Sequence, residues 1–354
     1  MARHRRASRM TFALLAAVAV VAVGIVILKS EPAGAKPSQL AQDTPSPILT
    51  TPIEGQVAQA PPKVELLRTI DNPAAPTTVP TTNPSGSAGA IPPRAAPEGD
   101  PETIFRNATA KRDAGDLVTA RDMVNDALQA GRFSGSDAQE AKAFIGTLNE
   151  KIILGTQKFT ADAYNKQWKV EPGTVLVKLA KRFDVTAELL CRVNGLSSPH
   201  KLKAGVTIKA IQGPFHLVVS KSRFEADLYL GNAGGANSMY LKTVRVGLGS
   251  DGSTPTGTWK VETGKVTNPV YYSPRGEGVV AADDPKNPLG ERWIPLTGIE
   301  GDCVGKESYG IHGTIEPDSI GKNMSLGCIR LLDEDVKLLY DLLVEQKSTV
   351  KVID

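Results

Sequence analysis

The sequence predicts a multidomain protein whose C-terminal part is mainly β-sheet. From residue 215 onward, apolar and polar residues alternate in short runs, as at 216–220, and Gly, Asn and Pro turns separate these runs. A period of two indicates an antiparallel sheet of the sandwich or barrel type. Ahead of it, residues 100–160 show apolar spacings of three and four, and residues 165–212 read as strand, helix, helix, strand. We therefore expect a short α-helical unit, a small βααβ module and a β-rich domain at 215–354.

The first 29 residues predict a basic cytoplasmic tail and an N-terminal transmembrane helix. Four arginines lie among the first ten residues, and residues 11–28 are without interruption apolar or small. Eighteen helical residues rise roughly 27 Å, which is close to the hydrocarbon thickness of a bilayer. The positive charge ahead of this anchor places the N-terminus in the cytoplasm and the rest of the chain across the membrane. The small residues Ala33-Gly34-Ala35 keep open the alternative of a cleaved signal and secretion.

Residues 30–99 predict a disordered linker. They hold more than half of the chain's 25 prolines, with Thr, Ser, Ala and Gln between them. Such a composition cannot bury enough apolar surface to offset the entropy of the chain. Tethered in this way to the inner membrane, the folded domains would reach the wall through the periplasm or wall space of the cell envelope.

The helical pattern at 100–160 resembles one tetratricopeptide-like hairpin unit, with breaks at Gly115-Asp116 and between Gly131 and Gly135. A single unit of this kind rarely stands alone, because its apolar face needs a neighbour. We expect it to pack on a neighbouring domain or to space the domains, and binding of a protein partner is the alternative.

Composition excludes several classes of function. A net charge of +3, with the basic excess concentrated at the N-terminus, indicates no nucleic-acid partner. Three cysteines spread over different modules do not form a disulfide framework, and a lone reactive thiol fits them better. No Cys/His cluster has the spacing of a zinc site and no Gly-rich loop resembles a phosphate cradle. We therefore expect neither a metal nor a cofactor.

His312 and Cys328 lie in a stretch of the β-rich domain that is rich in turn formers. A free thiol is only a few per cent thiolate at neutral pH, so a nucleophilic cysteine needs a base or a cation beside it. The other three histidines lie in the basic N-terminus, in a Ser-Pro loop and near the start of a strand. Gly327 lets the backbone approach a substrate carbonyl, so the amides of Gly327 and Cys328 could form an oxyanion hole.

This stretch resembles the catalytic signature of the L,D-transpeptidase (YkuD-like) family. The matching residues are His312, Gly313, Thr314, Ser325, Gly327, Cys328, Ile329 and Arg330. The resemblance implies the L,D-transpeptidase fold, with Cys328 as nucleophile, His312 as general base and the Gly313 carbonyl orienting the imidazole. The sequence departs at Leu326, where the family usually has a second histidine. Residues 254–259 and 287–294 also resemble segments that precede the family's catalytic loop.

The same resemblance implies acyl transfer on the stem peptides of peptidoglycan. Cys328 would attack a tetrapeptide stem, release D-alanine and pass the acyl group to an acceptor amine, which gives a cross-link. Water as the acceptor would make the protein an L,D-carboxypeptidase. Leu326 keeps open a third reading, a catalytically decayed protein that only binds peptidoglycan.

We expect specific roles for four side chains in or near the signature. Arg330 would pair with a substrate carboxylate or form a structural ion pair. Ser325 would hydrogen-bond within the site or hold the turn. Tyr309 is expected to pack, with a substrate contact as the alternative. Asp333 is predicted to cap a helix that braces the catalytic segment.

Residues 170–196, VEPGTVLVKLAKRFDVTAELLCRVNGL, resemble a lysin motif (LysM). Thr174 and Thr186 are predicted N-caps of its two helices, and Asn194-Gly195 is predicted to end the second helix. The resemblance implies binding to glycan strands that contain N-acetylglucosamine, such as those of peptidoglycan.

Overall fold

The computed structural model describes residues 94–354, with gaps at 232–237, 274–275 and 277. The predicted anchor at 1–29 lies outside the described residues, as does the predicted linker up to residue 93. Everything described belongs to one compact unit. Across the described residues, no helix combines the length and the apolar character that a membrane crossing requires.

Three helices, separated at the two predicted breaks, occupy the stretch that was predicted to be helical: α1 (Pro101–Asp113), α2 (Leu117–Gln129) and α3 (Gly135–Ile152). Aspartates cap the first two helices, because the carboxylate of Asp100 accepts from Thr103 N at 2.8 Å and that of Asp116 accepts from Thr119 N at 3.3 Å. The apolar positions spaced three and four apart face inward, and they include Ile104, Ala108, Val124, Ala127, Ala141, Ile145, Leu148 and Ile152.

The βααβ module forms as predicted, from β1 (Asn165–Lys169), α4 (Leu176–Arg182), α5 (Ala187–Arg192) and β2 (Thr207–Ile211), and β1 pairs antiparallel with β2. Thr186 caps α5 as expected, since its hydroxyl accepts from Leu189 N at 3.0 Å. The expectation for Thr174 was wrong by one residue. The N-cap of α4 is Val175, and the Thr174 hydroxyl instead accepts from Glu171 N within the preceding turn.

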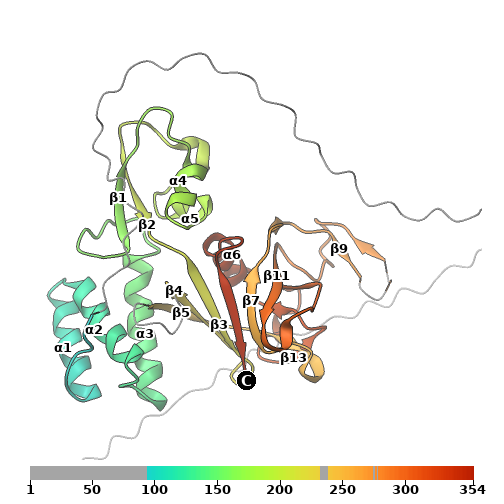
Figure 1. Ribbon diagram of the computed structural model, residues 1–354, viewed down its shortest axis with the longest axis horizontal. Coiled ribbons are helices and arrows are strands. Elements are labelled where there is room, and N and C mark those ends of the chain that lie inside the picture. Colours follow the sequence, from blue (N-terminus) through green and yellow to red (C-terminus); the bar gives the residue numbers. More distant parts are fainter. Residues whose placement is uncertain (1–93, 232–237, 274–275, 277) are drawn as a thin grey trace, which may run out of the picture. The chain divides into compact units, whose positions relative to one another are not determined.

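The β-rich domain is organised around one nine-stranded sheet, of which β3, β4, β5, β7 and β11 are labelled in Figure 1. The strand order is β14-β12-β11-β7-β15-β3-β4-β5, and β8 pairs with β11. Its strands are β3 (Phe215–Ser220), β4 (Glu225–Leu230), β5 (Met239–Arg245), β7 (Gly257–Val261), β8 (Val266–Thr267), β11 (Arg292–Glu300), β12 (Tyr309–His312), β14 (Ile329–Arg330) and β15 (Thr349–Ile353). Two short pairs lie outside it, β6 (Leu248–Gly249) with β13 (Asn323–Ser325) and β9 (Tyr271–Tyr272) with β10 (Val279–Val280).

The sheet is mixed, and this corrects the prediction of a purely antiparallel one. β15 runs parallel to β3, and β14 runs parallel to β12. Alternation reports which face a residue occupies but not the direction of the neighbouring strand. The strand order is a path with two ends, so the closed hydrogen-bond ladder of a barrel is not formed by the described strands.

Helix α6 (Asp333–Leu342) follows the catalytic stretch and buries Val336, Leu339 and Leu342. The predicted cap was wrong by one residue, because the N-cap is Leu332 and Asp333 is the first helical residue. The Asp333 carboxylate therefore interacts favourably with the positive end of the helix dipole but does not cap the helix. The C-terminal end is held by Lys265, whose Nζ donates to Leu343 O at 2.7 Å and to Tyr340 O at 2.5 Å. Burial lowers the pKa of Lys265 to about 8.

The helical unit covers the edge of the sheet at β5. Asn125 pairs with the edge backbone as a strand would, since its Oδ1 accepts from Tyr240 N at 3.0 Å and its Nδ2 donates to Ser238 O at 3.0 Å. Asn149 Nδ2 donates to Tyr240 O at 2.7 Å. An open strand edge invites pairing with other chains, and these helices block that route. Of the roles considered for the unit, packing on a neighbouring domain is the one observed.

The βααβ module contacts both neighbours. Asp341 in α6 binds Arg192 at 2.8 Å, and its carbonyl accepts from the Thr186 hydroxyl. On the other side, Lys209 Nζ donates to Ile152 O at 2.8 Å and to Gly155 O at 2.7 Å. Burial lowers the pKa of Lys209 to about 8. The module is therefore bonded both to the helix behind the catalytic stretch and to the end of α3.

Candidate active site

The register of two parallel strands brings the segments that carry the predicted nucleophile and base side by side. In the β12–β14 pair, Ile311 lies opposite Ile329 and His312 lies opposite Arg330. Side chains alternate along a strand, so His312 and Arg330 point to the same face. Cys328 directly precedes β14, and its thiol lies close enough to Arg330 and to the Gly310 amide for both to lower its pKa. Segments that are distant in the sequence thus lie side by side.

His312 is buried, with 5% of its surface exposed. Its Nδ1 lies 2.6 Å from the carbonyl of Gly313. A carbonyl can only accept, so Nδ1 carries the proton and Nε2 is left as the free basic nitrogen. Burial lowers the pKa of His312 to about 4, and the nearby Arg330 guanidinium lowers it further while the Gly313 carbonyl opposes the shift. The imidazole is therefore neutral at physiological pH.

Trp293 lies against this imidazole and was not among the predicted site residues. Trp293 is opposite His312 in the β11–β12 register, and the two rings stack with centroids 5.9 Å apart and planes 27° apart. The indole also covers Gly310, where an added Cβ would come within 2.5 Å of it. Trp293 belongs to the 287–294 segment that resembles the family, but only the strand register reveals its contact with His312.

Cys328 is partly exposed, and its Sγ lies 3.7 Å from the Ser308 carbonyl, to which the thiol donates weakly. Burial raises the pKa of the thiol, while the Gly310 amide and the Arg330 guanidinium act in the opposite direction. Among the hydrogen bonds of the described residues, none joins Sγ to the imidazole. The resting site therefore pairs a neutral thiol with a neutral imidazole.

Ser325 holds the turn that carries Cys328. Its buried hydroxyl accepts from Gly327 N at 3.1 Å and donates to Cys328 O at 2.6 Å. Of the two roles considered for Ser325, the structure shows the turn-holding one. The same bond corrects the expectation for Gly327, whose amide is engaged by Ser325 and is not open to a substrate oxygen.

Gly327 is required for close packing. Its φ of +133° is strained for any other residue, and an added Cβ would lie 2.7 Å from the Tyr309 ring and 2.8 Å from Ser253 O. Thr254 supports the turn from the same side, because its buried hydroxyl donates to Gly327 O at 2.9 Å and accepts from Gly249 N at 2.8 Å. Sequence reasoning noted the 254–259 stretch but gave Thr254 no role.

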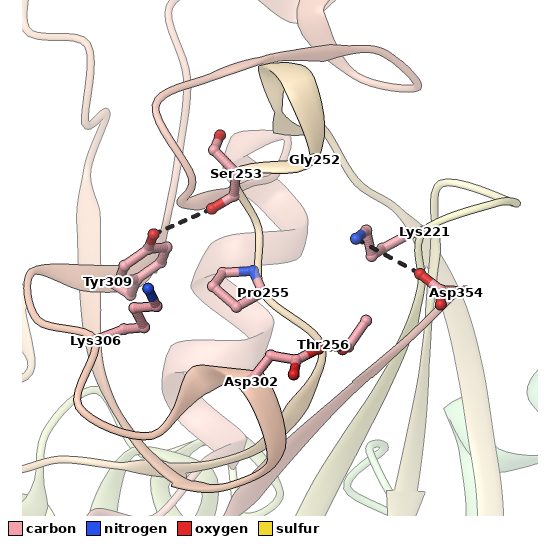
Figure 2. Close-up of a pocket in the computed structure, with 9 residues that line it drawn as sticks. All are labelled: Lys221, Gly252, Ser253, Pro255, Thr256, Asp302, Lys306, Tyr309 and Asp354. Carbon is pink, nitrogen blue, oxygen red and sulfur yellow. Dashed lines mark hydrogen bonds and ion pairs between the residues drawn. The ribbon is translucent and has the colours of Figure 1, made fainter.

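Tyr309 packs behind the turn, as expected. Its ring lies 5.0 Å from that of Trp259, and its hydroxyl donates to Ser253 O at 3.1 Å (Figure 2). Tyr309 also borders a cavity of about 410 Å³ between the 252–256 and 302–306 loops, whose lining includes Lys306 and Asp302 but neither Cys328 nor His312. The cavity lies beyond Tyr309 and does not open on the thiol.

The remaining signature residues lie at the rim of the site. Arg330 Nη1 donates to Glu316 Oε2 at 2.9 Å, so of the two partners considered for Arg330 the intramolecular one is present. Leu326, in place of the family's usual second histidine, is half exposed beside Met324, with 51% and 52% of their surfaces accessible. No group of three or more His, Cys, Asp and Glu side chains that could hold a metal occurs within the described ranges.

Two family descriptions match the chain. Residues 214–352 match the L,D-transpeptidase catalytic domain (YkuD), and residues 169–210 match the LysM domain. The protein named "Putative L,D-transpeptidase YkuD" from Bacillus subtilis is 30% identical over 176 residues, which cover 88% of it and 48% of this chain. Its namesake from Bacillus licheniformis is 29% identical over 177 residues, with the same shares covered.

Solved structures similar to this chain include an L,D-transpeptidase from Mycobacterium smegmatis. The similarity has a TM-score of 0.30 and 16% sequence identity, and it covers 42% of this chain. This chain spans 64% of the length of that protein.

Proposed function

Because the chain belongs to the L,D-transpeptidase (YkuD) family and carries a LysM domain, we propose that it is a peptidoglycan L,D-transpeptidase. It would transfer an acyl group from a tetrapeptide stem to an acceptor amine through a thioester on Cys328, with release of D-alanine. The single observation that carries this proposal is the β12–β14 register, which sets His312 opposite Arg330, two residues beyond Cys328.

The mechanism starts from a neutral pair. As the substrate carbonyl approaches, the basic Nε2 of His312 takes the proton of Cys328, and the thiolate attacks the carbonyl carbon. The imidazolium gives that proton to the departing D-alanine nitrogen, which leaves a thioester. The acceptor amine then attacks the thioester, His312 removes its extra proton, and Cys328 leaves as a thiol. The Gly313 carbonyl keeps Nδ1 protonated throughout and so keeps Nε2 directed at the reaction.

The backbone amide of Cys328 is the donor we assign to the developing oxyanion. The Gly327 amide already donates to Ser325. The Cys328 amide has no acceptor among the hydrogen bonds of the described residues. A fixed amide beside the nucleophile stabilises the tetrahedral intermediate without any reorganisation.

The proposal extends to the place of action. The LysM domain would hold glycan strands of peptidoglycan, and the apolar segment 11–28 would anchor the chain in the inner membrane with its folded part in the periplasm or wall space. A cleaved signal followed by secretion is the alternative. Labelling of the envelope fractions with an antibody to the folded part distinguishes the two.

The test of the proposed reaction is covalent labelling at Cys328. The protein is mixed with imipenem, a carbapenem of the class to which this family is generally susceptible, and its intact mass is measured. We expect a single adduct in the wild type and none in Cys328→Ala. Incubation with disaccharide-tetrapeptide should then yield dimers with loss of D-alanine.

Other results would point elsewhere. Tripeptide product without dimers would identify an L,D-carboxypeptidase. A folded wild-type protein that binds cell-wall sacculi but gives neither adduct nor product would identify a decayed, peptidoglycan-binding protein and would end the enzymatic proposal.

Thr254 provides a second, smaller prediction. Thr254→Val keeps the shape of the side chain but removes both hydrogen bonds to the turn, which leaves Gly249 N and Gly327 O without their partner. We expect about a tenfold slower imipenem labelling and a loss of about 1–3 kcal/mol of unfolding free energy. Labelling rates and urea unfolding measure the two effects. Thr254→Ser keeps the hydroxyl and should restore both, so equal behaviour of the Val and Ser variants would contradict a positioning role.

A further inference from the structure

Among the described residues, Arg330 is the signature residue that forms an ion pair, and its partner is Glu316. Arg330 is held firmly, because its backbone N and O bond to Gly247 at 2.8 and 2.9 Å and only 15% of its side chain is exposed. Glu316 differs, since 59% of its side chain is exposed. The cation is therefore fixed, and its carboxylate partner is at the surface.

Only the carboxylate end of Glu316 is free to move away. Its backbone is held in a turn, where Glu316 N donates to the Thr314 hydroxyl at 3.0 Å and Glu316 O accepts from the Ser319 hydroxyl at 2.7 Å. Rotation of the side chain would break the contact with Arg330 without disturbing this turn. An exposed ion pair of this kind contributes little to stability, so the rotation costs little.

The guanidinium can bind another anion in place of Glu316. Glu316 binds Nη1, and rotation of its exposed side chain would free that nitrogen, whereas Arg330 Nε is buried and has no acceptor among the described residues. The position is also suitable, because Arg330 lies opposite His312 and two residues beyond Cys328. The α-carboxylate of a C-terminal amino acid is three bonds beyond the peptide carbon that Cys328 would attack. A bidentate guanidinium is well matched to such a carboxylate.

We infer that the Glu316 carboxylate is displaceable. It forms an ion pair with Arg330 in the resting protein, and the terminal carboxylate of the donor peptide replaces it there. This inference rests on the proposed function and adds a determinant of specificity to it. The donor class is a stem peptide with a free C-terminal carboxylate. Peptides whose C-terminus is amidated cannot displace Glu316 and bind more weakly.

Binding is measured in the Cys328→Ala background of the full chain, so that turnover does not interfere. The probes are a tetrapeptide stem ending in free D-alanine and its C-terminal amide, each titrated by calorimetry. We expect Glu316→Gln to tighten binding of the acid about twofold to fivefold, which is the range of an exposed ion pair, and to leave the amide unchanged. Arg330→Gln should weaken binding of the acid about tenfold to a hundredfold and should change binding of the amide little.

Two controls separate this role from a structural one. Glu307→Gln removes an exposed carboxylate from the loop before Tyr309 and should change neither affinity. Arg330→Lys keeps the charge and should therefore bind the acid more tightly than Arg330→Gln does. Thermal unfolding checks that Arg330→Gln is folded. Equal affinity for acid and amide, or no tightening in Glu316→Gln, would overturn the inference. A wild-type protein that fails to react with imipenem would instead contradict the proposed function. The comparison of acid and amide binding would still test the role of Glu316, because it does not depend on turnover.

Discussion

His312→Ala is expected to slow thioester formation at Cys328 by about 10²- to 10⁴-fold, the range of general base catalysis. Burial raises the pKa of the Cys328 thiol, so almost none of it is thiolate at neutral pH, and the variant lacks the Nε2 that we propose as the acceptor of its proton. The measurement is the rate at which the imipenem adduct accumulates in the intact mass. The exposed His200, outside the catalytic domain, gives the matched control His200→Ala, which should react at the wild-type rate.

The pH dependence of the same rate follows from the pKa of His312. Burial lowers that pKa from 6.5 to about 4, so the basic form persists as the pH falls through 6 and 5 and is lost only near 4. The acid limb of the labelling rate should therefore lie near pH 4 rather than near 6.5. An acid limb near 6.5 would show that the imidazole is solvated in the working enzyme, and it would contradict the buried, neutral base.

The sequence identified the reacting groups but not what surrounds them. Cys328 and His312 could be selected because few cysteines and histidines occur and because flanking glycines mark the turn. Thr254 and Trp293 could not, because each acts through a contact between segments that are distant in sequence. The prediction that the Gly327 amide would be open to a substrate oxygen was wrong for a local reason. Nothing in the sequence shows that the Ser325 hydroxyl accepts a hydrogen bond from that amide.

The folds of the small domains were more predictable than their assembly. Apolar spacing and the break at Gly115-Asp116 predicted α1 and α2, because those signals are local. The packing of these helices on β5 depends on Asn125 and Asn149, which look like ordinary polar positions of a helix. Their amides matter because Tyr240 presents an unpaired strand edge. That edge is a property of the sheet order, which no local pattern encodes.

A buried charge network joins the helical unit to the chain entering the LysM domain, and its loss should be costly. The side chains of Arg121 and Asp162 are fully buried and lie 2.5 Å apart. Asp162 Oδ1 also accepts from Tyr164 N at 2.7 Å and from Asn165 N at 2.9 Å, which fixes the start of β1. Asp162→Ala would leave a buried guanidinium with less compensation and two amides without acceptors. We expect it to lower the unfolding free energy by about 3–5 kcal/mol, measured by urea unfolding.

The control for this effect is an ion pair of the same chemistry at the surface. Arg112 and Asp113 lie 2.9 Å apart, but 42% and 63% of their side chains are exposed. Water already solvates both groups, so Asp113→Ala should cost less than about 1 kcal/mol. Asp162→Asn tests the source of the larger effect, because the amide oxygen still accepts from Tyr164 N and Asn165 N while the charge is lost. If the buried charge dominates, Asp162→Asn behaves like Asp162→Ala. If Asp162→Ala is no worse than Asp113→Ala, the network is not what joins the two domains.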